Sequence, residues 1–210
     1  SYGSGASEGV EAVFEASFQV DLQHQEFPEL WKNGIFMDDE IPNWKERSEK
    51  YKALALPIIE ALENGENIEE IPSLDKNLDG INTACTQFKS EVKERILHWM
   101  NQDKKVGLLG GDHSTPLGYY EALATKYDNF GILHLDAHMD LRIAYEGFTY
   151  SHASIMYNAL QIPQISKIVQ VGIRDFCEQE VEVAKSDERV KIFTDMDLKS
   201  ENFDGINWKQ

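Results

Sequence analysis

The sequence has few cysteines and no long apolar run. Its 210 residues include only Cys85 and Cys177, which are too far apart for a CxxC motif and too few for a disulfide scaffold. Two cysteines in a chain of this length are typical of a reducing compartment, so we expect a cytoplasmic protein with buried thiols. The longest apolar stretches, such as 130–135, are far shorter than the roughly 18 residues of a membrane-spanning helix. The first residues also lack the order of a secretory signal, and we expect no membrane partner.

Basic residues are scarce as well. The chain has 20 Lys and Arg against 37 Asp and Glu, which gives a net charge of −17. A chain with this charge is repelled by the phosphates that dominate nucleic-acid affinity, so we expect no nucleic-acid partner. The field would favour a cationic ligand or a metal, but a solvated acidic surface explains the charge more simply.

The pattern from about residue 83 onward predicts the fold class. Short β-rich runs alternate with helical runs, and we find no internal repeat or long linker, so residues 1–210 are expected to form a single domain. The alternation predicts an α/β fold, a three-layer α/β/α arrangement with a mostly parallel sheet. The expected strands are 105–109, 130–135, 167–173 and 190–194, and the expected helices are 83–101, a helix opening at Pro116, 151–160 and 177–185.

The first eighty residues are less regular. Helices are expected at 7–18 and at 43–64, where Asn43 and Glu46 have the spacing of a capping box. The rest, including Pro72, is expected to form a loop-rich excursion over the sheet. The pattern does not indicate what residues 20–80 do.

Residues with metal-binding chemistry follow two of the expected strands. The Gly110–Ser114 turn would deliver His113 to the carboxyl edge of the sheet, although a capped turn with an exposed histidine also explains it. Farther on, Asp136, His138 and Asp140 alternate along an extended segment, so we expect all three on one side. Two crowded carboxylates repel each other unless a cation compensates. Oxygen and imidazole ligands without a thiolate suit Mn²⁺ better than a structural zinc site, with Fe, Co or Zn as alternatives.

A cluster with two carboxylates also permits a bridging ligand. Two ions a few ångströms apart could then share a hydroxide, which would make the cluster a hydrolytic centre. His134 has the same parity as Asp136. It could orient a ligand from behind the metal or pack in the core, and the sequence favours neither.

Several segments occur together in the order and spacing of a known family. The segments are Gly110–Ser114, Leu135–Asp140, Tyr150–Ser154 and Val171–Arg174. They resemble the signatures of the ureohydrolases, which include arginases, agmatinases and formiminoglutamases, and the resemblance runs over nearly the whole chain. The opening Ser1–Gly5 is also similar to a loop of the agmatinase branch.

This resemblance implies a site with two Mn²⁺ ions. His113, Asp136 and Asp140 would bind one ion, and Asp136 and His138 the other, with Asp136 as the bridge. His152 corresponds to the family's proton-shuttling histidine, and Asp140 would hold a proton of the attacking water and pass it on. The implied reaction is hydrolysis of a small cationic guanidino compound to an amine and urea. The family's usual trimers or hexamers imply a homo-oligomer.

The sequence also departs from the family. The family's first strand, its later Asp-x-Asp-x-x-Asp-Pro signature and its guanidinium-binding Glu are not in the sequence. Asp195 and Asp197 follow an expected strand that corresponds to a non-ligand strand of the family. We therefore expect an arginase-like fold truncated at both ends, with weak metal binding and little or no activity on its own.

The substrate is read from the segment after the metal ligands. Arg142 occupies the position where arginases place an Asn that recognises the amino-acid head group, and Asp140–His152 is more similar to agmatinases. We therefore expect conversion of agmatine to putrescine and urea, with Arg142 as a candidate substrate-binding residue. An unpaired Arg142 facing the pocket would instead favour arginine or another guanidino acid. The rival readings are a metal-poor, non-catalytic member of the fold and a deacetylase-like metal hydrolase.

Overall fold

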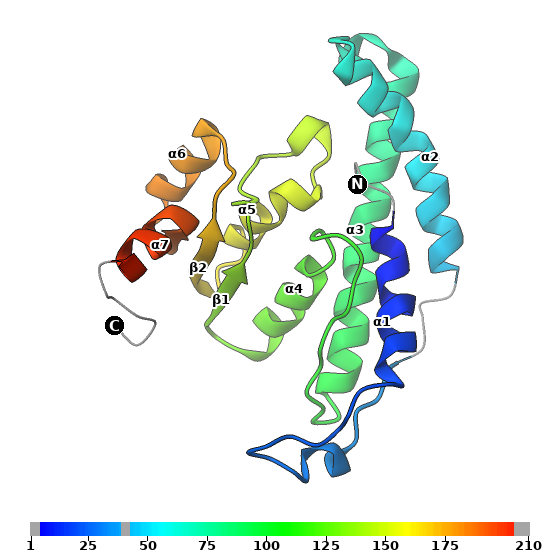
Figure 1. Cartoon of the computed structure of the whole chain (residues 1–210). Helices are drawn as coiled ribbons and strands as arrows, with labels where there is room; N and C mark the ends of the chain where they lie inside the picture. Colours follow the sequence, from blue (N-terminus) through cyan, green and yellow to red (C-terminus); the bar gives the residue numbers. More distant parts are fainter. Residues whose placement is uncertain (1–4, 39–42, 204–210) are drawn as a thin grey trace.

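The computed structural model describes residues 5–38 and 43–203, so most of the Ser1–Gly5 motif lies outside it (Figure 1). No helix in these two ranges has the length and apolar character needed to cross a membrane. The helices are α1 (Gly9–Ser17), α2 (Trp44–Glu63), α3 (Pro72–Met100), α4 (Leu117–Lys126), α5 (Ile155–Leu160), α6 (Glu178–Ser186) and α7 (Asp195–Phe203), and the strands are β1 (Phe130–Leu135), β2 (Ile165–Ile173) and β3 (Val190–Thr194).

The strands form a parallel sheet in the order β1-β2-β3. A helix lies between each strand and the next in the sequence, which is the connection that parallel pairing requires. The predicted α/β class with a parallel sheet is therefore confirmed. In Figure 1, α2 and α3 form a long helical pair on one side of the molecule, and α4 lies between that pair and the sheet.

The predicted strand at 105–109 is wrong. This segment pairs with no strand in the described part of the chain. Its half-buried Val106 and Leu108 pack against a cluster of α3 and α4 residues instead, and the Tyr119 hydroxyl donates to the Val106 carbonyl at 2.8 Å. The alternate apolar side chains that predicted a strand are thus covered by helices and not by a sheet. Among the residues described, β1 therefore has no partner strand on its outer edge.

The predicted loop before residue 83 is also wrong, because α3 begins at Pro72. Proline is favoured at the first helical position, where its missing N–H has no partner to lose. The α2–α3 pair encloses a small core of its own, formed by Ile58, Ala61, Ile68 and Ile81. The predicted capping box at Asn43 does not form, since Asn43 is left-handed (φ 60°) and makes no side-chain cap.

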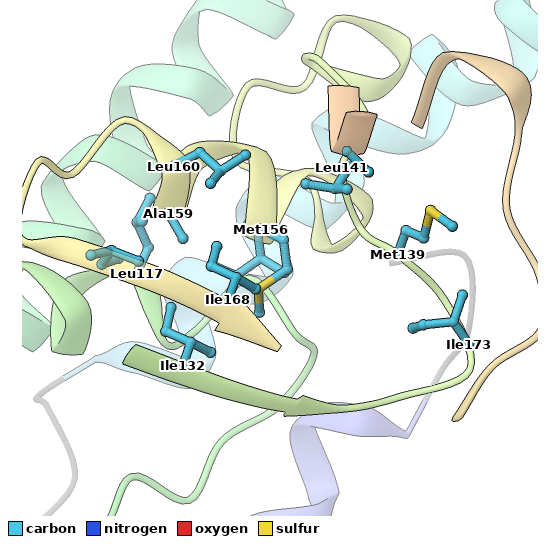
Figure 2. Packing of buried hydrophobic residues seen from close by; sticks show 12 residues of the cluster. Leu117, Ile132, Met139, Leu141, Met156, Ala159, Leu160, Ile168 and Ile173 are labelled. Atoms are coloured by element: carbon cyan, nitrogen blue, oxygen red, sulfur yellow. The ribbon is translucent and has the colours of Figure 1, made fainter. Parts of the chain in front are cut away.

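The main core covers one face of the sheet. Ile132 and Ile168 point into a cluster with side chains from α4, α5 and α6 (Figure 2). On the other face of β1, Leu133 and Leu135 are 67% and 71% exposed. Because side chains alternate along a strand, the inward row of β1 runs from Ile132 through buried His134 toward Asp136.

Candidate metal centre

The loop after β1 is held in place by backbone hydrogen bonds from two directions. The Asp136 N–H donates to Val171, and the Arg174 and Asp175 N–H groups donate to Ala137, so β2 extends the ladder past the end of β1. From the other side, the N–H of Met156 at the start of α5 donates to the Asp140 carbonyl at 3.0 Å. The segment that carries the candidate ligands is therefore fixed by the core elements.

Two local turns bring His113 and Asp140 together. Asp112 Oδ1 accepts the Ser114 N–H at 3.0 Å, an Asx-type turn that presents His113. Asp140 has a left-handed backbone (φ 53°), which Asp tolerates better than most residues, and it is only 5% exposed. His113 Nδ1 donates to Asp140 Oδ2 at 2.6 Å.

Four side chains form a compact cluster. One ligand atom from each of His113, His134, Asp136 and Asp140 lies within 4.8 Å of the others. His113 Nδ1 and His134 Nε2 are each 3.4 Å from Asp136 Oδ2. The structure thus brings together three of the predicted ligands and adds His134, which the sequence analysis left open between a supporting and a core role.

His138 lies at the edge of this cluster rather than in it. Its side chain is 58% exposed, with Nδ1 3.4 Å from Asp136 Oδ1 and Nε2 3.6 Å from Asp175 Oδ2. The expectation that His138 shares a side with Asp136 assumed an extended segment, but β1 ends at Leu135 and the chain bends at Ala137 before His138 forms an isolated bridge with Asp175. Its role as a ligand stays a prediction.

The other predicted site residues lie nearby. The Arg142 guanidinium stacks over the Tyr145 ring at 4.6 Å, and Arg142 Nε is 3.7 Å from Glu180 Oε2. His152 opens the 3-10 turn His152–Ser154 next to Ala153, whose carbonyl accepts the Arg142 N–H. In the described part of the chain, the His152 side chain makes no hydrogen bond or ion pair with the cluster, and its role stays a prediction.

The acids after β3 have a structural use. Thr194 Oγ1 donates to Asp197 Oδ2 at 2.6 Å and accepts the Asp197 N–H, and Lys199 Nζ pairs with Asp195 at 2.7 Å. These contacts stabilise the start of α7, and neither acid belongs to the four-residue cluster.

The electrostatics of the cluster suit a cation. Burial acts to lower the pKa of His113, but the hydrogen bond to Asp140 and the charges of Asp140 and Asp136 outweigh it and raise that pKa. Burial acts to raise the pKa of Asp136, but the His138 N–H and the neighbouring imidazoles lower it. For His134, burial and the nearby His113 lower the pKa, so this ring is neutral at pH 7. The Asp136 and Asp140 carboxylates therefore lie beside two imidazole rings where a cation could sit.

The donor set also fits a divalent metal ion. Carboxylate oxygens and imidazole nitrogens without a thiolate are ligands of Mn²⁺, Fe²⁺, Co²⁺ and Zn²⁺. The fold and the cluster together define the class, an α/β protein with a candidate carboxylate–imidazole metal site at the carboxyl edge of a parallel sheet.

The comparisons with known proteins identify the family. The sequence profile of the Arginase family matches residues 1–207, and the chain belongs to this family. The chain is 36% identical to the N(1)-aminopropylagmatine ureohydrolase of Thermus thermophilus over 94 residues. This aligned segment covers 45% of this chain and 31% of that protein. The chain is 33% identical over 94 residues to the agmatinase of Bacillus cereus, covering 45% and 32%.

A solved structure supports the same relationship. The arginase of Medicago truncatula superposes with a TM-score of 0.51 at 32% identity, over 54% of this chain and 36% of that chain. The expected resemblance to ureohydrolases and the arginase-like fold are thus confirmed. The matched segment spans about a third of the length of each of these three proteins.

Proposed function

We propose that this chain carries part of the active site of a metal-dependent amidinohydrolase that converts agmatine to putrescine and urea. The observation that carries the proposal is the convergence of His113, Asp136 and Asp140 at the carboxyl edge of the sheet. Membership of the Arginase family and the similarity to two enzymes named for agmatine substrates support it.

We assign the chemistry to residues as follows. His113, Asp136 and Asp140 would hold one Mn²⁺, and Asp136 and the half-exposed His138 would contribute to a second site. When bound, such ions supply an activated water and positive charge for attack on a guanidinium carbon. Asp140 would accept a proton of that water, and His152 would carry protons between the site and solvent.

The surroundings of Arg142 favour agmatine over a guanidino acid. A guanidino acid brings a carboxylate that a free arginine could bind. Arg142 already lies over Tyr145 and beside the carboxylate of buried Glu180, so it is not a free receiver for a second carboxylate. Arginine is nevertheless kept as the second candidate substrate, because the superposed Medicago truncatula structure is an arginase.

Metal analysis and a urea assay test the proposal together. Purified chain would be loaded with Mn²⁺, desalted and analysed for metal, and then assayed for urea with agmatine, arginine and guanidinobutyrate. We expect bound Mn²⁺ that is lost in the Asp140→Asn variant, and urea from agmatine in preference to the others in any form that is active. Absence of metal from the wild-type chain would favour a non-catalytic member of the fold or a fragment with an incomplete metal site. Two bound ions with urea from arginine alone would favour an arginase.

We further propose that the protein acts in the cytoplasm as a homo-oligomer, a trimer or hexamer. The exposed Leu133 and Leu135 on the open sheet face are consistent with a surface that other protein covers. Sedimentation velocity at several protein concentrations checks the assembly, and a monomer at all of them would contradict it.

A further inference from the structure

Gln170 is a fully buried polar side chain that the proposed chemistry does not use. It lies on β2 directly opposite His134 of β1 in the parallel register. Its amide nitrogen is 2.6 Å from the Met139 carbonyl oxygen and 2.9 Å from His134 Nδ1. One amide therefore contacts the strand before Asp136 and the residue before Asp140.

The Met139 carbonyl fixes which way round the amide lies. A carbonyl oxygen only accepts hydrogen bonds, so the atom of Gln170 at 2.6 Å from it must be the nitrogen. The second hydrogen of that nitrogen then points to His134 Nδ1, which must accept it. In this orientation Gln170 Oε1 is buried without a hydrogen-bond partner, which costs free energy.

The tautomer of His134 follows from this contact. A neutral imidazole has one nitrogen with a hydrogen and one without. Because Nδ1 accepts from Gln170, the hydrogen of His134 is on Nε2, and Nε2 faces Asp136 Oδ2 at 3.4 Å. An Nε2 that carries its hydrogen has no lone pair to give a metal.

We infer that Gln170 is a positioning residue, which holds His134 in its Nε2–H tautomer so that this N–H faces the Asp136 carboxylate and Nε2 stays out of the metal's ligand set. His134 therefore differs from His113, Asp136 and Asp140 although all four side chains converge. By contacting Met139 as well, the same amide restrains the backbone next to Asp140. The inference rests on the proposed metal site only for its effect on metal binding, because the tautomer is a property of the metal-free chain.

Imidazole NMR tests the tautomer directly. Long-range ¹H–¹⁵N spectra of the metal-free chain distinguish a protonated from an unprotonated ring nitrogen, and comparison with the His134→Gln variant assigns the signals. We expect His134 to be Nε2–H in the wild-type chain and a mixture of tautomers in Gln170→Met, which keeps the volume and removes the donor. A wild-type His134 with its hydrogen on Nδ1 would overturn the inference, whether or not the variants fold.

Metal affinity tests the consequence. In Gln170→Met we expect a fall in Mn²⁺ affinity of about tenfold, because the amide no longer restrains the Met139 backbone next to the ligand Asp140. Gln161→Met is the matched control, because Gln161 is exposed and its amide contacts only the Tyr157 carbonyl, and its affinity should be unchanged. Gln170→Glu is the second variant; its carboxylate accepts from Nδ1–H and so reverses the tautomer. The visible spectrum of the Co²⁺-loaded protein should then change as His134 Nε2 joins the ligands.

The two proposals fail in different ways. A chain that binds no metal but has His134 as Nε2–H would contradict the proposed function and leave the tautomer assignment standing. Normal Mn²⁺ binding with unchanged affinity and tautomer in Gln170→Met and Gln170→Glu would contradict the role of Gln170 and leave the proposed function standing.

Discussion

The two faces of β1 have different surroundings although they belong to the same six residues. The inward row, Ile132 and His134, is covered by α4, α5 and the β2 side chains. The outward row, Leu133 and Leu135, is apolar and largely exposed. Asp136 continues the inward row, so the covered face both supplies the stability of the sheet and orients this candidate ligand.

This difference shows that apolar character alone does not decide which side chains stabilise the fold. Leucine on the open face removes little surface from water, whereas isoleucine on the covered face removes nearly all of it. Substitutions that are matched in size but placed on opposite faces should therefore have very different effects.

The largest difference is expected between Ile168→Ala and Leu133→Ala. Ile168 is fully buried, so its truncation leaves a cavity and should lower the free energy of unfolding by about 3 kcal/mol. Leu133→Ala should cost less than about 1 kcal/mol. Urea denaturation followed by circular dichroism measures both. Equal losses would mean that the outward face is covered in solution.

A smaller loss is expected where the covered side meets the site loop. Glu180 is buried in α6 and accepts the N–H groups of Leu141 at 3.1 Å and Cys177 at 2.9 Å. Glu180→Ala leaves these donors unpaired and should cost about 2 kcal/mol in unfolding free energy. The exposed Glu182 on the same helix is the control, and Glu182→Ala should change stability by less than about 0.5 kcal/mol. A similar result for both variants would show that Glu180 does not fix the loop.

A pH-dependent contribution is expected at the entry to β3. Arg189 donates to Asp187 and to the Leu160 and Ile165 carbonyls, and its hydrogen bond holds the pKa of Asp187 below the ordinary 3.8. Because the folded pKa is the lower one, this stabilisation is complete above pH 3.8 and is lost as the pH falls through the folded value. The partly exposed pair should contribute less than about 1 kcal/mol.

The variant Asp187→Asn checks the sign of this effect. Its unfolding free energy should fall less steeply than that of the wild-type chain as the pH falls below 3.8. Parallel pH curves for the two proteins would contradict the assignment.

The smallest change in stability is expected for Leu133→Thr combined with Leu135→Thr. Both residues are more than half exposed and threonine is a good strand residue, so the cost should be about 0.5 kcal/mol or less. The change removes an exposed apolar patch and should lower both the binding of a hydrophobic dye and the self-association seen by light scattering. Unchanged association would mean that other surfaces hold the copies together.

Strand alternation predicted much of this sheet and less of its surroundings. The strands at 130–135 and 190–194 have the predicted bounds, because each is a short apolar run between turn signals. The run at 105–109 has the same local pattern, but its half-buried side chains pack on α3 and α4. Apolar alternation in the sequence predicts that alternate side chains are buried. It does not predict whether a neighbouring strand or a helix buries them.

The candidate site was predictable to a similar degree. Alternation placed His134, Asp136, His138 and Asp140 on one side, and it could not show where β1 stops. The structure ends the strand at Leu135, which turns His138 outward and leaves His134 opposite Gln170. The sequence indicated that His134 lies near the site, because it has the same parity as Asp136. Its buried partner Gln170 lies 36 positions farther along the chain, so the local pattern could not predict that contact.

The left-handed backbone of Asp140 narrows the range of residues that this position tolerates. Most side chains are disfavoured there by their own Cβ, whereas Asn and Asp are accepted. Of these two, only aspartate brings the negative charge that faces His113. Backbone sterics and side-chain charge therefore restrict this position independently. In a saturation library at position 140, we expect the asparagine variant to fold without binding metal. Variants with larger or β-branched residues should neither fold stably nor bind metal.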